Sequence, residues 1–205
     1  MCNEIARRQD LQTLVEDFGQ LIDLPPFRWW EDKIPNDLAA KDSVRIGDPS
    51  LVVRLRDDHL EGQMLPWAWK SPNGKPVFNF VSEGRDFSKS DRVLVFADGF
   101  YEFTAPENPK LKLKNKHLFE MIGQPWFWIA GIVRENAFTL LTTAPGPDLI
   151  PYHDRQIVTL APSAGMDWLN LSQTEAEIFR LPPAGTFNVT TIRRGGEPAA
   201  QGSLF

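Results

Sequence analysis

The candidate reactive groups of this sequence begin at Cys2, its single cysteine, which directly follows the initiator methionine. Removal of Met1, which is typical when the second residue is small, leaves a thiol and a free α-amine on one residue. That amine has a reference pKa of about 7.7–8.0, and a thiol is strongly nucleophilic at neutral pH. Such a 1,2-aminothiol forms a Schiff base with an aldehyde and then closes a thiazolidine ring. The alternative is a small buried apolar residue, as free cysteines often are.

Two further residues are candidates for proton transfer. Glu102 lies in "DGFYEF" and shares a strand face with Phe100. Aromatic neighbours raise the pKa of a carboxyl group, which lets it move protons near neutral pH, whereas a solvent-facing strand surface needs no such role. His153 lies in "PYHDRQIV", where Asp154 and Arg155 follow it at a loop-to-strand junction. It is either a second acid or base beside the thiol and the carboxyl group or a structural histidine.

An amide side chain interrupts an apolar strand at Asn79, in "VFNFV". In a core it would need hydrogen-bond partners, and in a site it would orient a substrate or the N-terminal amine. The histidines, His59, His117 and His153, are scattered and form no metal-binding spacing with the lone cysteine. We therefore expect neither a metal nor a cofactor.

The charge of the sequence excludes one broad class of nucleic-acid binder. The net charge is −5 and the pI is about 5.3, which leaves room for a local basic groove but not for a wholly phosphate-binding surface. The alternating lysines of "KLKLKNKHLF" favour a solvated edge strand, with a phosphate-contacting strip as the alternative. In "LPWAWK", Trp67 and Trp69 have basic sequence neighbours such as Arg85, a combination that stacks unpaired bases or packs a core.

Hydrophobic patterns predict few helices and many short strands. A helix is predicted over residues 10–22 from apolar residues at helical spacing, and another at 172–180 from the capping-box pair Ser172 and Glu175. Strands are predicted at 51–56, 76–81, 92–97, 99–103, 125–133, 138–143, 156–160 and 186–192. Because these strands do not alternate with helices, a doubly wound parallel sheet is disfavoured. The predicted fold class is α+β: a single compact domain over residues 1–205, with a mostly antiparallel, β-barrel-like core, a few flanking helices and a loose tail at 194–205.

Three features of the sequence indicate where in the cell the protein acts. No run of about 18 apolar residues is present, and the first ten residues lack the apolar core of a secretion signal. One cysteine cannot form an internal disulfide, which also favours a reducing compartment. We expect a cytoplasmic protein with no membrane partner, and a monomer as the default for this size.

Several motifs together resemble the family of SOS response-associated peptidases. Typical members begin M-C-G-R, carry a D-G-[WF]-[YF]-E-W strand and an N-A-R-x-E element, and contain T-T-x-A-N followed by [IM]-H-D-R-M-P. This sequence begins "MC" and contains "FADGFYEF", "FNFVSEG" and "TTAPGPDLIPYHDRQIVTL" in matching order along most of its length. Together, the "HDR" and "DGFYE" matches are fairly specific for this family, although either match alone would be weak evidence.

The resemblance implies a compact α+β domain that protects abasic sites in single-stranded DNA during the SOS response to DNA damage. It implies that Met1 is removed by autoprocessing and that Cys2 forms a thiazolidine with the ring-opened sugar aldehyde. Glu102 would then transfer protons and assist Met1 removal, His153 would assist Schiff-base chemistry, and Asn79 would align the abasic sugar. The DNA contacts implied by the resemblance or by the aromatic and basic pattern are Trp67, Arg85, Phe103, Thr143 and Arg155. Such a protein would associate with the nucleoid when bound to DNA.

This sequence departs from the family pattern near the expected DNA groove. Glu4 stands where the family has arginine in M-C-G-R, and Val81 stands at the arginine of N-A-R. Each change removes a positive charge, which predicts weaker and less salt-dependent DNA binding.

Two other functions are compatible with the same residues. One is a cysteine hydrolase of the N-terminal-nucleophile type that acts on peptides or amides through an acyl-enzyme. The other is a non-catalytic module that binds single-stranded DNA and keeps the motif residues for packing.

Overall fold

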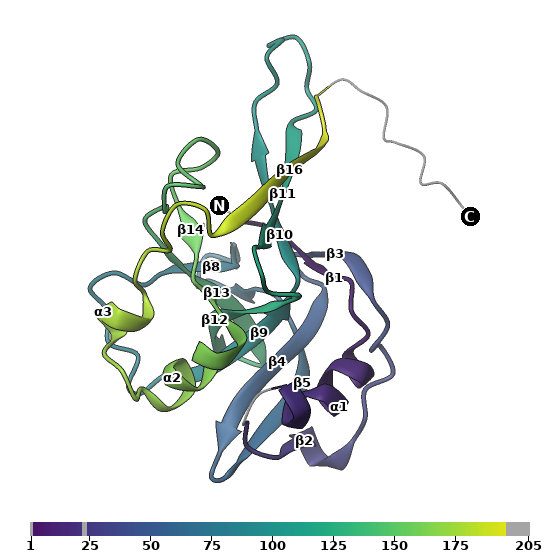
Figure 1. Cartoon of the computed structure of the whole chain (residues 1–205), viewed down its shortest axis with the longest axis vertical. Helices are drawn as coiled ribbons and strands as arrows, with labels where there is room; N and C mark the ends of the chain where they lie inside the picture. Colours follow the sequence, from purple (N-terminus) through teal and green to yellow (C-terminus); the bar gives the residue numbers. More distant parts are fainter. Residues whose placement is uncertain (1, 22–23, 196–205) are drawn as a thin grey trace.

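The computed structural model describes residues 2–21 and 24–195 (Figure 1). Within these residues the strands form two main sheets and a short separate pair. The first sheet has the order β16-β11-β10-β1-β3, with β1 (Glu4–Arg7), β3 (Lys41–Arg45), β10 (Gly99–Thr104), β11 (Asn115–Met121) and β16 (Phe187–Arg193). The separate pair is β6 (Trp69–Lys70) with β7 (Pro76–Val77).

The second sheet is longer and has the order β14-β13-β12-β9-β4-β5-β2, with β15 also paired to β12 and β8 to β13. Its strands are β2 (Phe27–Trp29), β4 (Pro49–Arg56), β5 (His59–Pro66), β8 (Asn79–Val81), β9 (Asp91–Ala97), β12 (Phe127–Arg134), β13 (Ala137–Thr143), β14 (Gln156–Ile157) and β15 (Thr159–Leu160). Among the described strands, β8–β13 and β2–β5 pair in parallel and the other pairs are antiparallel. The predicted α+β class is confirmed, although these sheets stay open instead of closing into a barrel.

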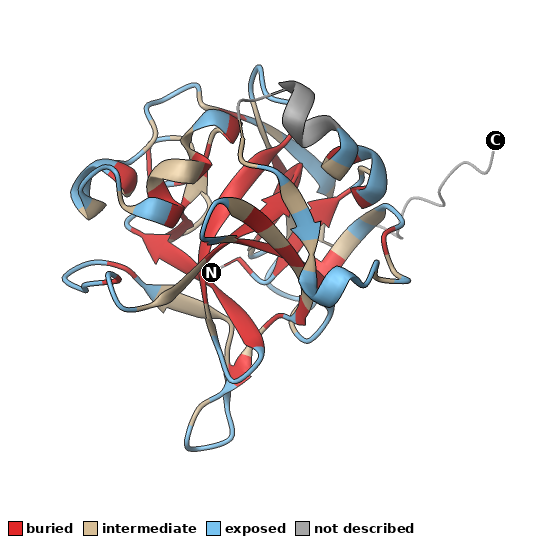
Figure 2. Cartoon of the chain, turned by 90° about the horizontal axis from the view of Figure 1, so that it is seen from below, coloured by how far each residue is buried: buried red, intermediate tan, exposed pale blue. Residues whose placement is uncertain are grey.

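Aromatic side chains join the two sheets through a shared core. Phe100 of β10 stacks on Phe119 of β11 at a ring distance of 4.9 Å and meets Phe127 of β12 edge-on at 6.3 Å. Figure 2 shows the buried residues gathered in the central strands, with exposed residues on the helices and loop tips. Because β10 carries Glu102 two residues beyond Phe100, this core fixes the position of the candidate carboxyl group.

The helices lie at the periphery of the sheets (Figure 1). They are α1 (Leu11–Leu21), α2 (Gly165–Asn170), α3 (Glu175–Ile178) and the 3₁₀ turns η1 (Trp30–Asp32) and η2 (Pro162–Ala164). The helix predicted at 10–22 is confirmed through Leu21, and residue 22 lies outside the described residues. It begins after Asp10, whose carboxylate accepts hydrogen bonds from the backbone amides of Gln12 and Thr13 at 3.0 and 3.2 Å.

The second predicted helix is shorter and begins later than expected. Its capping box is formed by Thr174 and Glu177, whereas the sequence pattern favoured Ser172 and Glu175. Both pairs have the same spacing, so the pattern alone could not choose between them. The Glu175 carboxylate instead accepts a hydrogen bond from the Phe87 amide at 2.7 Å.

The predicted lysine-rich edge strand is wrong for most of its length. Residues 110–114 form a loop between β10 and β11, and only Lys116 of the four alternating lysines lies in a strand. β11 begins at Asn115 and pairs with strands on both sides, so it is an interior strand. The loop and the ends of its flanking strands project from the rest of the molecule (Figure 1).

A β-bulge distorts the pairing of β11 with β16. Lys116 pairs with Arg193 and His117 pairs with Thr191, so one extra residue of β16 lies between these pairs. A bulge of this kind redirects side chains, because residues two apart otherwise point to the same face. Thr191 therefore accompanies His117, while Arg193 accompanies Lys116 in a different cavity.

Trp67 is a core residue, which contradicts its assignment as a DNA contact. Its exposed fraction is 0%, its ring stacks on Phe138, and its Nε1 donates to the Phe78 carbonyl at 2.8 Å. A ring enclosed in this way has no free face for a base. The packing interpretation, which the sequence left open, is the correct one.

Trp67→Ala should therefore destabilise the fold by about 3–5 kcal/mol, because it empties a large enclosed volume and removes one of the two hydrogen bonds that the Phe78 carbonyl accepts. Trp30→Ala is the matched control, because Trp30 is 38% exposed and its loss should change stability by about 0.5 kcal/mol or less. Urea unfolding monitored by circular dichroism measures both. Equal effects of the two substitutions would contradict the core assignment.

Candidate active site

Cys2 lies beyond the N-terminal end of β1, two residues before that strand begins. β1 pairs with β10 through Ile5 opposite Phe100, so the chain before β1 runs beside the part of β10 that carries Glu102. The Cys2 side chain is buried, and its thiol donates a hydrogen bond to the Glu4 carbonyl at 3.4 Å. Burial raises the pKa of this thiol, and the negative charge of Glu102 raises it further. Cys2 and Glu102 are therefore close enough to interact electrostatically.

Asn79 connects Cys2 to the second sheet. Its Nδ2 donates to the Cys2 carbonyl at 2.7 Å, and β8, which carries Asn79, pairs with β13 through Leu140. The amide oxygen of Asn79 is buried and makes no hydrogen bond within the described part of the chain. Asn79 thus fixes the backbone of Cys2 and presents a buried acceptor beside it.

Glu102 occupies a strongly desolvated position. The residue is only 1% exposed, and burial raises the pKa of its carboxyl group to about 7. The cause is the loss of water around the charged form. The Asp154 charge raises the pKa in the same direction, which places the loop that carries His153 within electrostatic range of Glu102. A group with this pKa gives up and accepts protons readily near neutral pH.

His153 lies on the loop between β13 and β14. Its Nδ1 lies 2.7 Å from an Asp154 carboxylate oxygen and 3.1 Å from the Arg155 amide nitrogen. Burial lowers the pKa of this imidazole, so the neutral ring is favoured at pH 7. With Nδ1 turned to these neighbours, Nε2 is the nitrogen that can exchange a proton with a reacting group.

Arg155 is bound to Glu83 in a two-point ion pair. Its Nη1 and Nη2 each lie 2.7 Å from a Glu83 carboxylate oxygen, and Nη2 also donates to the Thr142 carbonyl at 2.8 Å. Glu83 in turn accepts from the Ala144 amide at 2.8 Å. The charge of Arg155 is therefore largely neutralised, and its main effect in this geometry is to hold the His153 loop against β13 and the segment after β8.

Basic residues surround Glu4 on the outer face of the first sheet. Lys116 and Ser43 donate to its carboxylate at 2.6 and 2.5 Å, and Arg45 lies 3.7 Å away. Burial opposes ionisation of Glu4, but these hydrogen bonds prevail and lower its pKa. Phe103, Lys116, Arg45 and Arg193 line a cavity of about 360 Å³ together with Asn3, Glu4 and Ile46. Basic residues from other strands thus surround the position where the family pattern has arginine.

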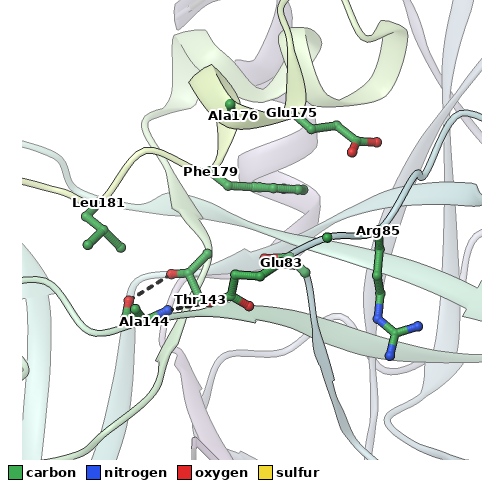
Figure 3. Close-up of a pocket in the computed structure, with 10 residues that line it drawn as sticks. Glu83, Arg85, Thr143, Ala144, Glu175, Ala176, Phe179 and Leu181 are labelled. Carbon is green, nitrogen blue, oxygen red and sulfur yellow. Dashed lines mark hydrogen bonds between the residues drawn. The ribbon is translucent and has the colours of Figure 1, made fainter.

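Two other expected DNA contacts, Arg85 and Thr143, line a separate cavity of about 500 Å³. Figure 3 shows the Phe179 ring between α3 and the Thr143–Ala144 segment of this mostly apolar pocket. The Arg85 guanidinium lies over the Phe80 ring at 4.4 Å. Val81 of β8 is 44% exposed beside this region. The structure thus brings Cys2, Asn79 and Glu102 together, with the His153 loop next to them. The expected DNA contacts are separated: Arg155 lies on that loop, and the others lie in two cavities and the core.

Sequence reasoning missed three contributors to the site. Lys116 was read as part of a solvated strip, although it is mostly buried against Tyr101, with Nζ 3.7 Å from the ring centre. Glu83 lies within the motif "FNFVSEG", but the sequence pattern assigns it no role. His117 is one of three scattered histidines, and only strand register shows that it lies opposite Glu102.

Neither metal-binding clusters nor membrane spans were found among the described residues. No group of three or more His, Cys, Asp or Glu side chains there converges in a way that could hold a metal ion. No helix in the same residues is long and apolar enough to cross a membrane.

Comparison with known proteins agrees with the family resemblance of the sequence motifs. The profile of the SOS response associated peptidase family (SRAP) matches residues 1–193. The chain belongs to this family. It is 24% identical over 209 residues to abasic site processing protein YedK of Escherichia coli, covering 90% of this chain and 86% of that protein. It is 30% identical over 134 residues to abasic site processing protein YoqW of Bacillus subtilis, covering 58% of this chain and 59% of that protein.

Solved structures show the same fold at low sequence identity. A phage-related protein of Bordetella bronchiseptica gives a TM-score of 0.67 at 22% identity, covering 94% of this chain and 95% of its own. A protein of Bacteroides thetaiotaomicron gives a TM-score of 0.69 at 18% identity, covering 94% and 92%. This SRAP chain is thus a divergent member whose fold is retained.

The raised pKa of Glu102 predicts how stability varies with pH. Between about pH 4.5 and 7 the folded state binds more protons at this carboxyl group than the unfolded state does. Stability should therefore fall as pH rises through this window. Glu102→Gln removes the penalty, so it should be near neutral at pH 4.5 and should stabilise by up to about 3 kcal/mol at pH 8. Urea unfolding of both proteins across this range is the measurement, and equal stability of the two at pH 8 would count against the desolvated carboxyl group.

Proposed function

We propose that this SRAP chain binds single-stranded DNA and, after loss of Met1, forms a covalent thiazolidine between Cys2 and the aldehyde of an abasic site. Met1 removal is a self-processing step in this proposal, and the abasic site is shielded by the crosslink during the response to DNA damage. The protein would act in the cytoplasm, at the nucleoid, and as a monomer. Met1 itself lies outside the described residues.

The observation that carries the proposal is the hydrogen bond of Asn79 to the Cys2 carbonyl, which holds the residue beside the buried Glu102 carboxyl group. An aminothiol reacts with an aldehyde only if both its amine and its thiol reach the same carbon. Fixing the Cys2 backbone supports this geometry, because it orients both groups from one anchor. The buried amide oxygen of Asn79 is a ready acceptor for a sugar hydroxyl group.

The proton transfers balance with Glu102 as carrier. The Cys2 amine attacks the aldehyde carbon, and one amine proton moves to the carbonyl oxygen. The protonated Glu102 then donates to the resulting hydroxyl group, which departs as water and leaves an iminium ion that keeps one N–H. The Glu102 carboxylate accepts the thiol proton as sulfur adds to the iminium carbon, which gives the neutral thiazolidine and restores the protonated carboxyl group. The raised pKa of the thiol makes this general base necessary, because little thiolate exists at pH 7 without it.

His153 is placed to assist the iminium stage. A neutral imidazole whose Nδ1–H donates to the Asp154 carboxylate can accept a proton at Nε2 from the protonated amine and return it later. Glu83 and Arg155 support this role by holding the loop in place.

Crosslinking is directly measurable. An oligonucleotide with one abasic site should give a covalent adduct with the wild-type protein on a denaturing gel, with the mass of the complex less one water. Cys2→Ala should give none, and Glu102→Gln should be slower by about 10²–10⁴-fold.

Glu135→Gln is the matched control, because Glu135 is an exposed turn residue and its substitution should leave the rate unchanged. The intact mass of the purified protein shows whether Met1 is absent, which the chemistry requires. No adduct from Met1-free wild-type protein at low salt would overturn the proposal. An acyl adduct with peptide or amide substrates instead would favour the N-terminal-nucleophile hydrolase.

Glu4 provides a separate test of the DNA path. If strand phosphates approach the cavity that Lys116, Arg45 and Arg193 line, Glu4→Gln frees Lys116 from its ion pair and adds a phosphate contact. Single-stranded DNA should then bind more tightly at low salt, and the slope of log K against log salt should steepen by about 0.7 per added contact. Fluorescence anisotropy at several salt concentrations measures this, with Glu16→Gln on α1 as the charge-matched control. An unchanged slope would place the DNA elsewhere.

A further inference from the structure

The inner face of the first sheet changes from apolar to polar along the paired residues of β10 and β11. The pairs, in order toward the 105–114 loop, are Phe100 with Phe119, Glu102 with His117, and Thr104 with Asn115. Directly opposed residues of antiparallel strands share a face, with Cβ atoms about 4.5–5.5 Å apart. The buried carboxyl group therefore lies between a stacked aromatic pair on one side and a polar group of side chains on the other.

His117 connects two hydroxyl groups within this polar group. Its Nε2 lies 2.8 Å from Thr104 Oγ1, and its Nδ1 lies 3.0 Å from Thr191 Oγ1. The imidazole is buried, and burial lowers its pKa, so the ring is neutral with one donor and one acceptor nitrogen. Because a hydroxyl group can donate or accept, the chain Thr104–His117–Thr191 can be oriented in either direction.

Neighbouring groups hold this chain in place. Asn115 Nδ2 donates to Thr104 Oγ1 at 3.2 Å, and the Tyr152 ring meets the His117 ring edge-on at 4.7 Å. Tyr152 directly precedes His153, so the His153 loop covers the chain. The bulge in β16 aligns Thr191 with His117.

The Thr191 end of this row of hydrogen bonds opens into a cavity of about 380 Å³ beneath the 105–114 loop. His117, Thr191, Asn115 and Arg194 are among its lining residues. Glu102 is only 1% exposed, whereas Thr104, its same-face neighbour two residues along β10, is half-buried and bonded to this chain. Glu102 and His117 are directly opposed, so their Cβ atoms lie about 4.5–5.5 Å apart and the carboxyl group is within reach of the Thr104–His117 hydrogen bond.

We propose that His117 is a positioning residue for Glu102 and that, with Thr104 and Thr191, it carries protons between that carboxyl group and solvent in the cavity. This inference rests on the proposed function, because it concerns the protons that Glu102 exchanges during thiazolidine formation. It assigns roles to side chains that the "DGFYEF" and "HDR" motifs do not contain.

Each proton in this relay has a donor and an acceptor. A protonated Glu102 passes its proton to the Thr104 oxygen while the Thr104 hydroxyl proton moves to His117 Nε2. The Nδ1 proton moves to Thr191, and the Thr191 hydroxyl proton passes to a water molecule in the cavity. Glu102 ends as a carboxylate, one water has gained a proton, and His117 has exchanged one neutral tautomer for the other. The reverse sequence reprotonates Glu102.

His117→Ala and His117→Gln test the relay by different means. Alanine leaves space that free imidazole can enter from the cavity, whereas glutamine fills the space and hydrogen-bonds but cannot exchange tautomers. Both should slow thiazolidine formation by about tenfold at saturating DNA, with an unchanged Kd for single-stranded DNA. Added imidazole should restore the rate of His117→Ala and leave that of His117→Gln unchanged.

The matched control is His59→Ala, because His59 lies on β5 beside Asp58 and outside the site. Rates are recorded from pH 5 to 9. The titratable and charged groups facing this region come from five segments. They are Glu102 on β10, Cys2 before β1, Glu107 and Lys114 on the loop before β11, Tyr152, His153 and Asp154 on the loop after β13, and Arg194 after β16. The apparent pKa of the carboxyl group should appear in the profile of wild-type protein and of imidazole-rescued His117→Ala.

The outcomes separate the relay from the proposed function. Wild-type rates and profiles in both variants, or slowing without imidazole rescue, would overturn the relay and leave crosslinking intact. A second arm uses glycolaldehyde as the probe and follows the adduct of Met1-free protein by intact mass. If the protein does not crosslink to DNA but forms this adduct in a His117-dependent, imidazole-rescued way, the DNA function fails and the relay stands.

Discussion

The hydrogen bond from Asn79 to the Cys2 carbonyl joins the two sheets at the N-terminal end of the chain. Cys2 precedes β1 of the first sheet, and Asn79 belongs to β8 of the second. An N-terminal residue is otherwise a frayed end, with backbone freedom that would have to be lost in each reaction. Because the anchor comes from a strand paired with β13, the position of Cys2 depends on the packing of both sheets, not on the local sequence around it.

Burial then determines the chemistry of the anchored residue. The same apolar core that stacks Phe100 on Phe119 removes water from Glu102 and from the Cys2 thiol, and it raises the pKa of both. Desolvation weakens the thiol as a spontaneous nucleophile but places beside it a carboxyl group that gains and loses protons near pH 7. In the proposed reaction, Cys2 would therefore react slowly without Glu102 and depend strongly on it, and the energetic cost of burying the carboxyl group is reduced stability above neutral pH.

The motif residues were predictable from sequence because local patterns carry them. "DGFYEF" alternates as a strand must, and a cysteine behind Met1 is chemically distinct wherever it occurs. What sequence could not give was cross-strand register. The position of His117 opposite Glu102, and of Lys116 beside Glu4, follows from pairings between segments whose loop lengths and bulges leave no local signal. Trp67 shows the opposite limit, since aromatic residues near basic ones in sequence do not reveal whether a ring is enclosed.

Glu4 illustrates how a family can change a residue and keep a local balance of charge. Read alone, a carboxylate at the expected arginine position predicts repulsion of a phosphate. In the folded chain, Lys116, Arg45 and Arg193 lie around it from three other strands, and Lys116 neutralises it directly. The basic residues around Glu4 come from β3 on one side of β1 and from β11 and β16 beyond β10 on the other. A divergent sequence can thus preserve a basic surface there, because electrostatic attraction depends on where charges lie in space and not on which strand supplies them.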